Sequence, residues 1–258
     1  MQLLEQLGTI SFEIGSGCNY AHSFCPITDP LRYPPEELAT PLDKTVVGDF
    51  LKAARENGFK GHIGWNIYCE PLLYAERMAD WISFILVSSP DTKFSLLTNG
   101  RLLDFKHKSL LQKFNKICIT LYSRDDEKRV IPLLESGLLE GVSEVVLGYT
   151  WLSEYLLRHP SNIGTFLTSP DERIRVYDVP PSQIYTPCAR PMHDMEINYY
   201  GNVRMCCIDY RGSMKIGNIC RDPAQIVIES FIKTAQEAAK GTPPICSKCK
   251  SLWSNCAM

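Results

Sequence analysis

The sequence predicts an α/β protein: a partial (β/α) barrel of about five to six parallel strands, followed by a small C-terminal β-hairpin and helix that bind a metal cluster. Two observations support this prediction. Short apolar stretches alternate with helical patterns up to about Pro180-Pro181, where the pattern changes. Most of the 11 cysteines lie beyond that point, which favours a cluster-binding segment there. We therefore expect one domain over residues 1–180 and a second over residues 181–258.

The first domain is expected to form a parallel sheet, because each apolar stretch is separated from the next by enough residues for a helix. Crossovers between such strands are right-handed, and the units are too few to close an eightfold barrel. The expected strands are Thr9–Ile14, His62–Tyr68, Lys93–Thr98, Lys116–Tyr122, Ser143–Tyr149 and Arg173–Asp178. The expected helices are Pro41–Gly58, Glu70–Ser88, Phe105–Phe114, Asp126–Gly137 and Thr150–His159.

The second domain begins with two short β-like stretches, Glu196–Tyr199 and Asn202–Cys206. Tyr200-Gly201-Asn202 between them is typical of a hairpin turn. A helix is expected from about Pro223 to Lys240, and the tail after it is rich in turn residues and cysteine.

Composition excludes several classes of protein. Hydrophobic residues make up 45% of the chain, charged residues 22%, and the net charge is −2, as in ordinary globular proteins. No charge bias indicates nucleic acid or membrane as a partner, and no signal peptide or membrane span is visible, so we expect a cytoplasmic protein. Clustered cysteines in such a chain favour metal binding over disulfides.

The residues whose side chains could bind a ligand or take part in a reaction follow the expected strands. Cys18 follows the first strand, Tyr68-Cys69-Glu70-Pro71 the second, Thr98-Asn99-Gly100 the third and Tyr122-Ser123-Arg124 the fourth. Function in parallel sheets is found at the carboxyl ends of the strands. These loops are therefore expected to meet at one rim.

Two sets of metal ligands are expected. Cys18, His22 and Cys25 have the spacing i, i+4, i+7, which allows three ligands to hold one iron–sulfur cluster and leave one iron open. The second set lies in the C-terminal domain, where a C-x-x-C pair places two thiolates on one tight loop. Its members are Cys188, Cys206, Cys246 and Cys249, with Cys256 as an extra or alternative ligand.

These patterns resemble the radical S-adenosylmethionine (SAM) superfamily with a C-terminal twitch or SPASM-type auxiliary-cluster domain. The first loop resembles the family's C-x3-C-x-Φ-C motif, with Phe24 at the aromatic position that lines the adenine. Tyr68-Cys69-Glu70-Pro71 resembles the Gly-Gly-Glu element that binds the methionine amino group. Cys188-x12-Gly201-x4-Cys206 with the C-x-x-C pair resembles the twitch pattern. The resemblance implies two [4Fe-4S] clusters and SAM as cofactors, and it adds Asn99 and Ser123 as cofactor-binding candidates.

The resemblance also implies a reaction: cleavage of SAM to a 5′-deoxyadenosyl radical, abstraction of a substrate hydrogen, and transfer of an electron to the auxiliary cluster. The net result would be dehydrogenation of a small molecule, and the chain resembles the butirosin-type inosamine dehydrogenases, which are similarly short. Arg175 and Tyr68 are the candidate catalytic residues. A short peptide is the alternative substrate, as in peptide-modifying SPASM enzymes. A reductase such as flavodoxin or ferredoxin is the expected partner.

The chain departs from the family pattern at two positions: His22 replaces the middle cysteine, and Cys69 replaces a glycine. Imidazole can ligate cluster iron but raises the reduction potential relative to a thiolate, whereas sulfonium cleavage needs a very low potential. Three interpretations stay open. His22 ligates the cluster, Cys69 supplies the third thiolate, or the cluster is partial or absent. The last would make the chain a degenerate or non-radical SAM or iron–sulfur binding protein.

Overall fold

The computed structural model describes residues 4–20, 25–29, 32–33, 40–65, 67–149, 190–207, 209–240 and 243. Within these residues the strands form one seven-stranded sheet in the order β5-β4-β3-β2-β1-β6-β7. All neighbouring strands are parallel except β6 and β7, which are antiparallel. The strands are β1 (Thr9–Phe12), β2 (His62–Trp65), β3 (Phe94–Thr98), β4 (Lys116–Leu121), β5 (Glu144–Tyr149), β6 (Asp194–Ile197) and β7 (Val203–Arg204).

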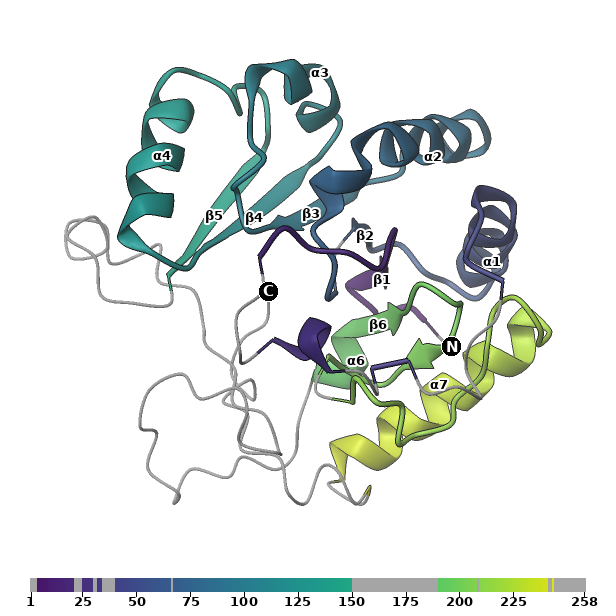
Figure 1. Ribbon diagram of the computed structural model, residues 1–258. Helices are drawn as coiled ribbons and strands as arrows, with labels where there is room; N and C mark the ends of the chain where they lie inside the picture. Colours follow the sequence, from purple (N-terminus) through teal and green to yellow (C-terminus); the bar gives the residue numbers. More distant parts are fainter. Residues whose placement is uncertain are drawn as a thin grey trace.

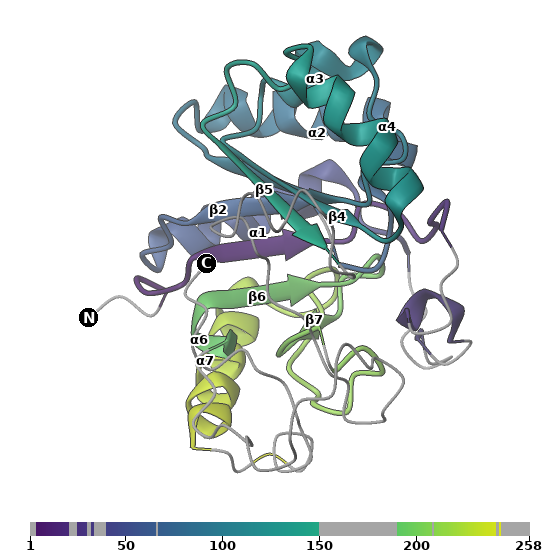
Figure 2. The same ribbon diagram turned by 90° about the vertical axis from the view of Figure 1, so that its left-hand side faces the viewer.

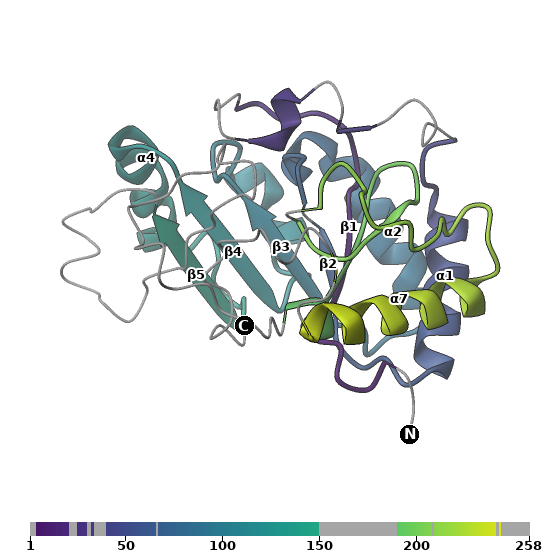
Figure 3. The ribbon, with the colours of Figure 1, turned by 90° about the horizontal axis from the view of Figure 1, so that it is seen from below.

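The sheet curves, and the longer helices lie along its convex face (Figure 1). The same arrangement is visible from below, where α7 lies beside α1 (Figure 3). The helices are α1 (Lys44–Glu56), α2 (Ala75–Ser88), α3 (Lys108–Leu111), α4 (Arg124–Glu135), α6 (Arg190–His193) and α7 (Ala224–Ala239), with 3-10 turns at η1 (Pro26–Thr28), η3 (Pro71–Tyr74) and η4 (Phe105–His107). None of these described helices is long and apolar enough to span a bilayer.

Alternation along β4 shows how the two faces of the sheet differ. Ile117, Ile119 and Leu121 are fully buried on the helix side, where Ile119 approaches Val130 of α4. Cys118 and Thr120 point to the other face and are half-buried. At β4 the convex face therefore carries apolar core residues, and the concave face carries smaller and polar side chains.

The predicted partial barrel is confirmed, with shorter elements than the sequence suggests. β2 ends at Trp65, and Ile67 then has a positive φ of 85°, so the chain leaves the sheet before Glu70. The helix expected over residues 70–88 begins instead as η3, because Pro71 follows Glu70, whose side chain accepts the Leu72 N–H. The expected strand 173–178 and helix 150–159 lie outside the described residues.

The C-terminal hairpin is present and extends the main sheet. β6 pairs in parallel with β1, with Thr9 opposite Asp194, and β7 pairs back on β6. Gly201 forms the turn with a φ of +81°, a conformation that favours glycine. In Figure 2 β6 lies directly below β1, with α7 beneath it. Whether residues 1–180 and 181–258 are separate domains stays a prediction, because the expected boundary is not described.

Candidate cofactor and cluster site

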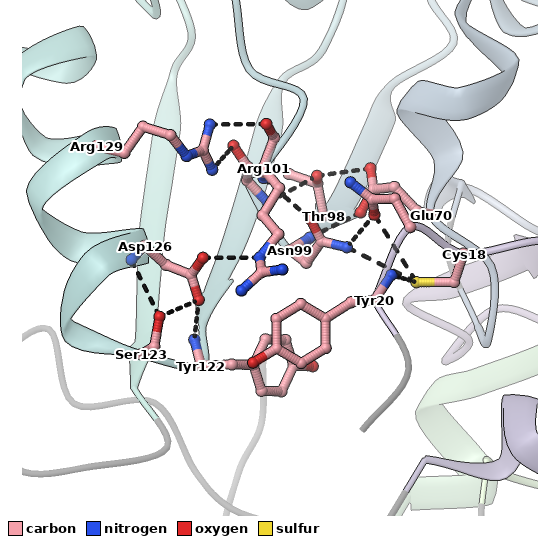
Figure 4. Close-up of polar contacts among 12 residues, drawn as sticks. Cys18, Tyr20, Glu70, Thr98, Asn99, Arg101, Tyr122, Ser123, Asp126 and Arg129 are labelled. Carbon is pink, nitrogen blue, oxygen red and sulfur yellow. Dashed lines mark hydrogen bonds and ion pairs between the residues drawn. The ribbon is translucent and has the colours of Figure 1, made fainter. Parts of the chain in front are cut away.

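Loops from the ends of three neighbouring strands meet at the carboxyl rim (Figure 4). The loop after β1 supplies Cys18, the loop after β2 supplies Glu70, and β3 leads into Asn99. The amide Nδ2 of Asn99 lies 3.7 Å from Cys18 Sγ, and its backbone N–H donates to Glu70 Oε2 at 2.9 Å. Three residues that the sequence predicts for cofactor and metal binding are thus neighbours in space.

Glu70 is the most constrained of these residues. Its side chain is almost fully buried, and Oε1 accepts hydrogen bonds from the Thr98 hydroxyl at 2.7 Å and the Leu72 N–H at 3.1 Å, while Oε2 accepts the Asn99 N–H. Burial raises the pKa of the carboxyl, and the hydrogen bonds oppose that shift. The carboxylate therefore ties the end of β2 to the end of β3.

Cys18 and Cys25 both lie in the segment between β1 and η1, and each is partly buried. Burial raises the pKa of both thiols. Cys18 Sγ also accepts the backbone N–H of Tyr20 at 3.4 Å. Hydrogen bonds to sulfur help set the properties of a cluster-bound thiolate. The other predicted residues of this loop, His22 and Phe24, lie outside the described residues.

A stack of aromatic and cationic groups lies beside Cys18, and no sequence pattern indicated it. The Tyr20 ring is 5.3 Å from the Tyr122 ring, and the Arg101 guanidinium lies 3.7 Å from the Tyr20 ring centroid. Arg101 Nε donates to Asp126 Oδ1 at 2.8 Å. Figure 4 shows the Arg101 side chain between Asp126 and the tyrosines. This arrangement holds the loop after Cys18 against the end of β4.

Ser123, which the sequence predicts to bind the cofactor, forms hydrogen bonds that stabilise the start of α4. Its side chain accepts the Asp126 N–H at 3.1 Å and donates to Asp126 Oδ2 at 2.9 Å, so it caps α4. Serine followed three residues later by an acidic residue is a capping signal that was present in the sequence. Cofactor contact by Ser123 stays a prediction.

Cys69 lies in the hydrophobic core rather than in an open ligand position. It is 8% exposed, and its thiol accepts hydrogen bonds from the backbone N–H groups of Gly15 and Ile14. Burial raises its pKa. Among the described residues no three His, Cys, Asp or Glu side chains converge as metal ligands. The geometry therefore gives no support to Cys69 as a partner of Cys18 and Cys25.

A second cluster of reactive groups surrounds Cys206 and Cys207, near the β6–β7 hairpin. Burial raises the pKa of the Cys206 thiol well above its ordinary value. Glu196 of β6 accepts the backbone N–H of Cys207, and Arg190 Nη2 lies 3.3 Å from Glu196 Oε1. The charges of both thiols also act on Tyr68, which lies beyond the end of β2. Cys206 and Cys207 thus lie near Tyr68, beyond the end of β2.

Ion pairs join the C-terminal segment to the loop that follows Cys25. Arg211 contacts the buried Asp29 through two nitrogens, at 2.8 and 2.9 Å from Oδ2. Glu13, fully buried beyond β1, accepts the Tyr33 hydroxyl at 2.6 Å and the Tyr199 N–H at 3.1 Å. Sequence alone gave no sign of these long-range contacts.

The donors that the structure describes suit iron–sulfur clusters. Cys18 and Cys25 in one place and Cys206 in the other are partly buried cysteines, which is the donor chemistry such clusters require. The remaining predicted ligands, Cys188, Cys246 and Cys249, lie outside the described residues, as does the candidate catalytic Arg175. Tyr68 is described, and its hydroxyl is buried with no hydrogen-bond partner in the described part of the chain.

Comparison with known proteins agrees with this fold and donor set. Residues 188–250 match the family model of SPASM, an iron–sulfur cluster-binding domain. The match confirms the expected SPASM-type domain over residues 188–250, and the partial-barrel fold agrees with the resemblance to radical SAM proteins. No curated protein sequence shows significant similarity to the chain.

Among solved structures the chain is similar to BtrN in complex with AdoMet and 2-DOIA, with a TM-score of 0.66 and 18% identity over 95% of this chain and 94% of that one. BtrN in an open conformation gives a TM-score of 0.61, also at 18% identity, over 98% of both chains. It is also similar to anSMEcpe with bound AdoMet, with a TM-score of 0.54 and 14% identity over 94% of this chain and 86% of that one. At identities this low, the structural similarity establishes a shared fold only.

Proposed function

We propose that the chain is a radical SAM-type iron–sulfur oxidoreductase that dehydrogenates a small polar molecule. The observation that carries the proposal is the meeting of Cys18, Glu70 and Asn99 at the carboxyl rim of this sheet. Two structurally similar proteins, BtrN and anSMEcpe, were solved with AdoMet bound. The iron–sulfur domain match over residues 188–250 supplies the second redox group.

In this proposal Cys18, His22 and Cys25 hold the first [4Fe-4S] cluster, and Phe24 lies against the adenine of SAM. Glu70 keeps the role of ammonium acceptor. An ionised carboxylate offers about four acceptor sites, and three of them are used within the protein. One site is then left for the methionine ammonium group, while the internal bonds fix the orientation of the carboxylate.

Cys188, Cys206, Cys246 and Cys249 would hold the second cluster. When bound, the two clusters and SAM would supply a carbon-centred radical that takes a hydrogen atom from the substrate and an acceptor for the electron left behind. A reductase such as flavodoxin or ferredoxin would supply the first electron.

Two buried polar groups on the concave side, near the second set of thiols, favour a polar substrate. The Tyr68 hydroxyl and Glu196 Oε2 are both buried and have no hydrogen-bond partner among the described residues. Leaving such atoms without a partner is costly, about 1–3 kcal/mol each. A hydroxyl or amino group of a small substrate would provide the missing hydrogen bonds. Tyr68 would then orient the substrate, and Arg175 is the second candidate for that role.

A second function is favoured by one specific feature, the histidine at position 22. If imidazole does not hold iron there, the chain would be a degenerate or non-radical protein that binds SAM or only the second cluster. A peptide-modifying enzyme is the remaining alternative, because anSMEcpe was also solved with AdoMet and the Cp18Cys peptide.

Anaerobic reconstitution followed by iron and sulfide counting tests the proposal. About eight irons per chain are expected for two [4Fe-4S] clusters, and about four for the second cluster alone. A Cys18→Ala, Cys25→Ala double variant should lose about half of the iron, whereas Cys118→Ala, on the concave face of β4, should lose none. Reduction with dithionite in the presence of SAM should release 5′-deoxyadenosine. Four irons per chain without 5′-deoxyadenosine would establish the degenerate alternative.

A further inference from the structure

Arg190 is a buried cation placed beside the second set of thiols. It begins α6, two residues after Cys188, and its side chain is only 11% exposed. Nη2 lies 3.3 Å from Glu196 Oε1, and Nε lies 3.9 Å from Asp194 Oδ2. Glu196 in turn accepts the backbone N–H of Cys207. A guanidinium, a carboxylate and the backbone of a thiol-bearing residue therefore form one connected group.

Arg190 is one of the charged groups that act on Cys206. Burial raises the pKa of Cys206, and Arg190 opposes that rise. Burial lowers the pKa of Arg190 itself, but its acidic neighbours, Glu196 and Asp194 among them, outweigh burial and raise it. Arg204, another buried arginine of the hairpin, acts on Glu13 and Asp209.

A cation in this position has a direct redox consequence. The potential of an iron–sulfur cluster depends on the net charge around it, on hydrogen bonds to its sulfurs and on exposure to water. Coulomb interactions are strong where water is excluded, so a buried positive charge stabilises the reduced, more negative form of the cluster. A buried carboxylate has the opposite effect. The balance between Arg190 and Glu196 should therefore set how readily the site accepts an electron.

From this geometry we infer that Arg190 and Glu196 are an opposed pair that sets the reduction potential of the second cluster, with Arg190 raising the potential and Glu196 lowering it. The inference rests on the proposed function. A dehydrogenation there would require the substrate radical to lose one proton and one electron. The oxidised second cluster would accept that electron, and Arg190 would make the transfer more favourable. Arg190 would thus act on the reaction through the charge around the cluster.

Redox titration followed by electron paramagnetic resonance tests the inference. The measurement uses the reconstituted full-length protein with Cys18→Ala and Cys25→Ala, so that only the second cluster contributes. In that background Arg190→Met should lower the midpoint potential of the second cluster by at least about 59 mV. For a one-electron couple this corresponds to a tenfold fall in the ratio of reduced to oxidised cluster at a fixed ambient potential. Glu196→Gln should shift the potential in the opposite direction, and the Arg190→Met, Glu196→Gln double variant should return toward the parent value.

Controls keep the result interpretable. Arg190→Lys retains the positive charge and should keep most of the parent potential, and Arg124→Met removes an exposed arginine and should leave the potential unchanged. Equal potentials in Arg190→Met and the parent, with the cluster retained, would overturn the inference. If Arg190→Met loses the cluster, the inference is tested by Glu196→Gln alone. A midpoint potential that does not rise in Glu196→Gln would then refute the role of the pair. Absence of the second cluster from the parent protein would instead refute the proposed function.

Discussion

Replacement of Glu70 gives the most direct test of how the rim is held together. Its carboxylate accepts three hydrogen bonds while being 1% exposed. Hydrogen bonds to a charged group contribute about 1.5–3 kcal/mol each, and the donors left buried in Glu70→Ala add a desolvation cost. Burial of the charge, which raises the carboxyl pKa, offsets part of that gain. We expect Glu70→Ala to lower the free energy of unfolding by about 3–5 kcal/mol.

Glu70→Gln is a sharper variant because it keeps the shape of the side chain. The Gln carbonyl can still accept from Thr98 and Leu72, but its NH2 group then faces the Asn99 N–H, so one bond is lost at about 1–2 kcal/mol. Urea unfolding of the cluster-free protein, under anaerobic conditions with reductant, measures both changes. Glu56→Ala, at an exposed site, is the matched control and should change stability by less than about 0.5 kcal/mol. If Glu70→Ala behaves like Glu56→Ala, the rim is not held by this carboxylate.

SAM binding gives a second measurement on the Glu70 variants that fold. Anaerobic calorimetry should show the binding free energy of SAM weakened by about 1.5–3 kcal/mol relative to wild type.

Other variants probe the remaining regions. Gly201→Ala should lower stability by about 1–3 kcal/mol, because φ is +81° and the new Cβ would lie 2.6 Å from Cys220 Sγ; unchanged melting would refute the turn geometry. Burial raises the pKa of Glu13 above 4.5 despite Arg32, so the folded state holds this proton more tightly. Wild-type stability relative to Glu13→Gln should therefore fall as the pH rises above 4.5 through the raised pKa, and parallel pH profiles would contradict this. His22→Cys should increase 5′-deoxyadenosine formation if histidine is the only defect, whereas His22→Ala should lose iron if histidine is a ligand; indifference of iron content and SAM cleavage to both would exclude it as one.

The order of strands and helices could be predicted from the sequence, because it depends on local apolar patterns and on the general rules for parallel sheets. The first five strands and the Tyr200-Gly201-Asn202 turn were predicted close to where they occur. The carboxyl ends of the third and fifth strands were predicted correctly, at Thr98 and Tyr149. Those of the first two were not, since the strands expected to reach Ile14 and Tyr68 end at Phe12 and Trp65. Apolar side chains continue beyond those points, but the backbone has already left the sheet.

For the site, the sequence determined the chemistry: thiols at characteristic spacings, an acidic residue after β2 and an amide after β3. Tertiary structure decided which of these groups meet. It brought Cys18, Glu70 and Asn99 together, placed Cys69 in the core, and gave Ser123 to a helix cap. The Arg101–Tyr20 stack and the Arg190–Glu196 pair depend on side-chain direction. Such direction has no signature in a single sequence, because a buried charge is identified only by the partner that the fold places beside it.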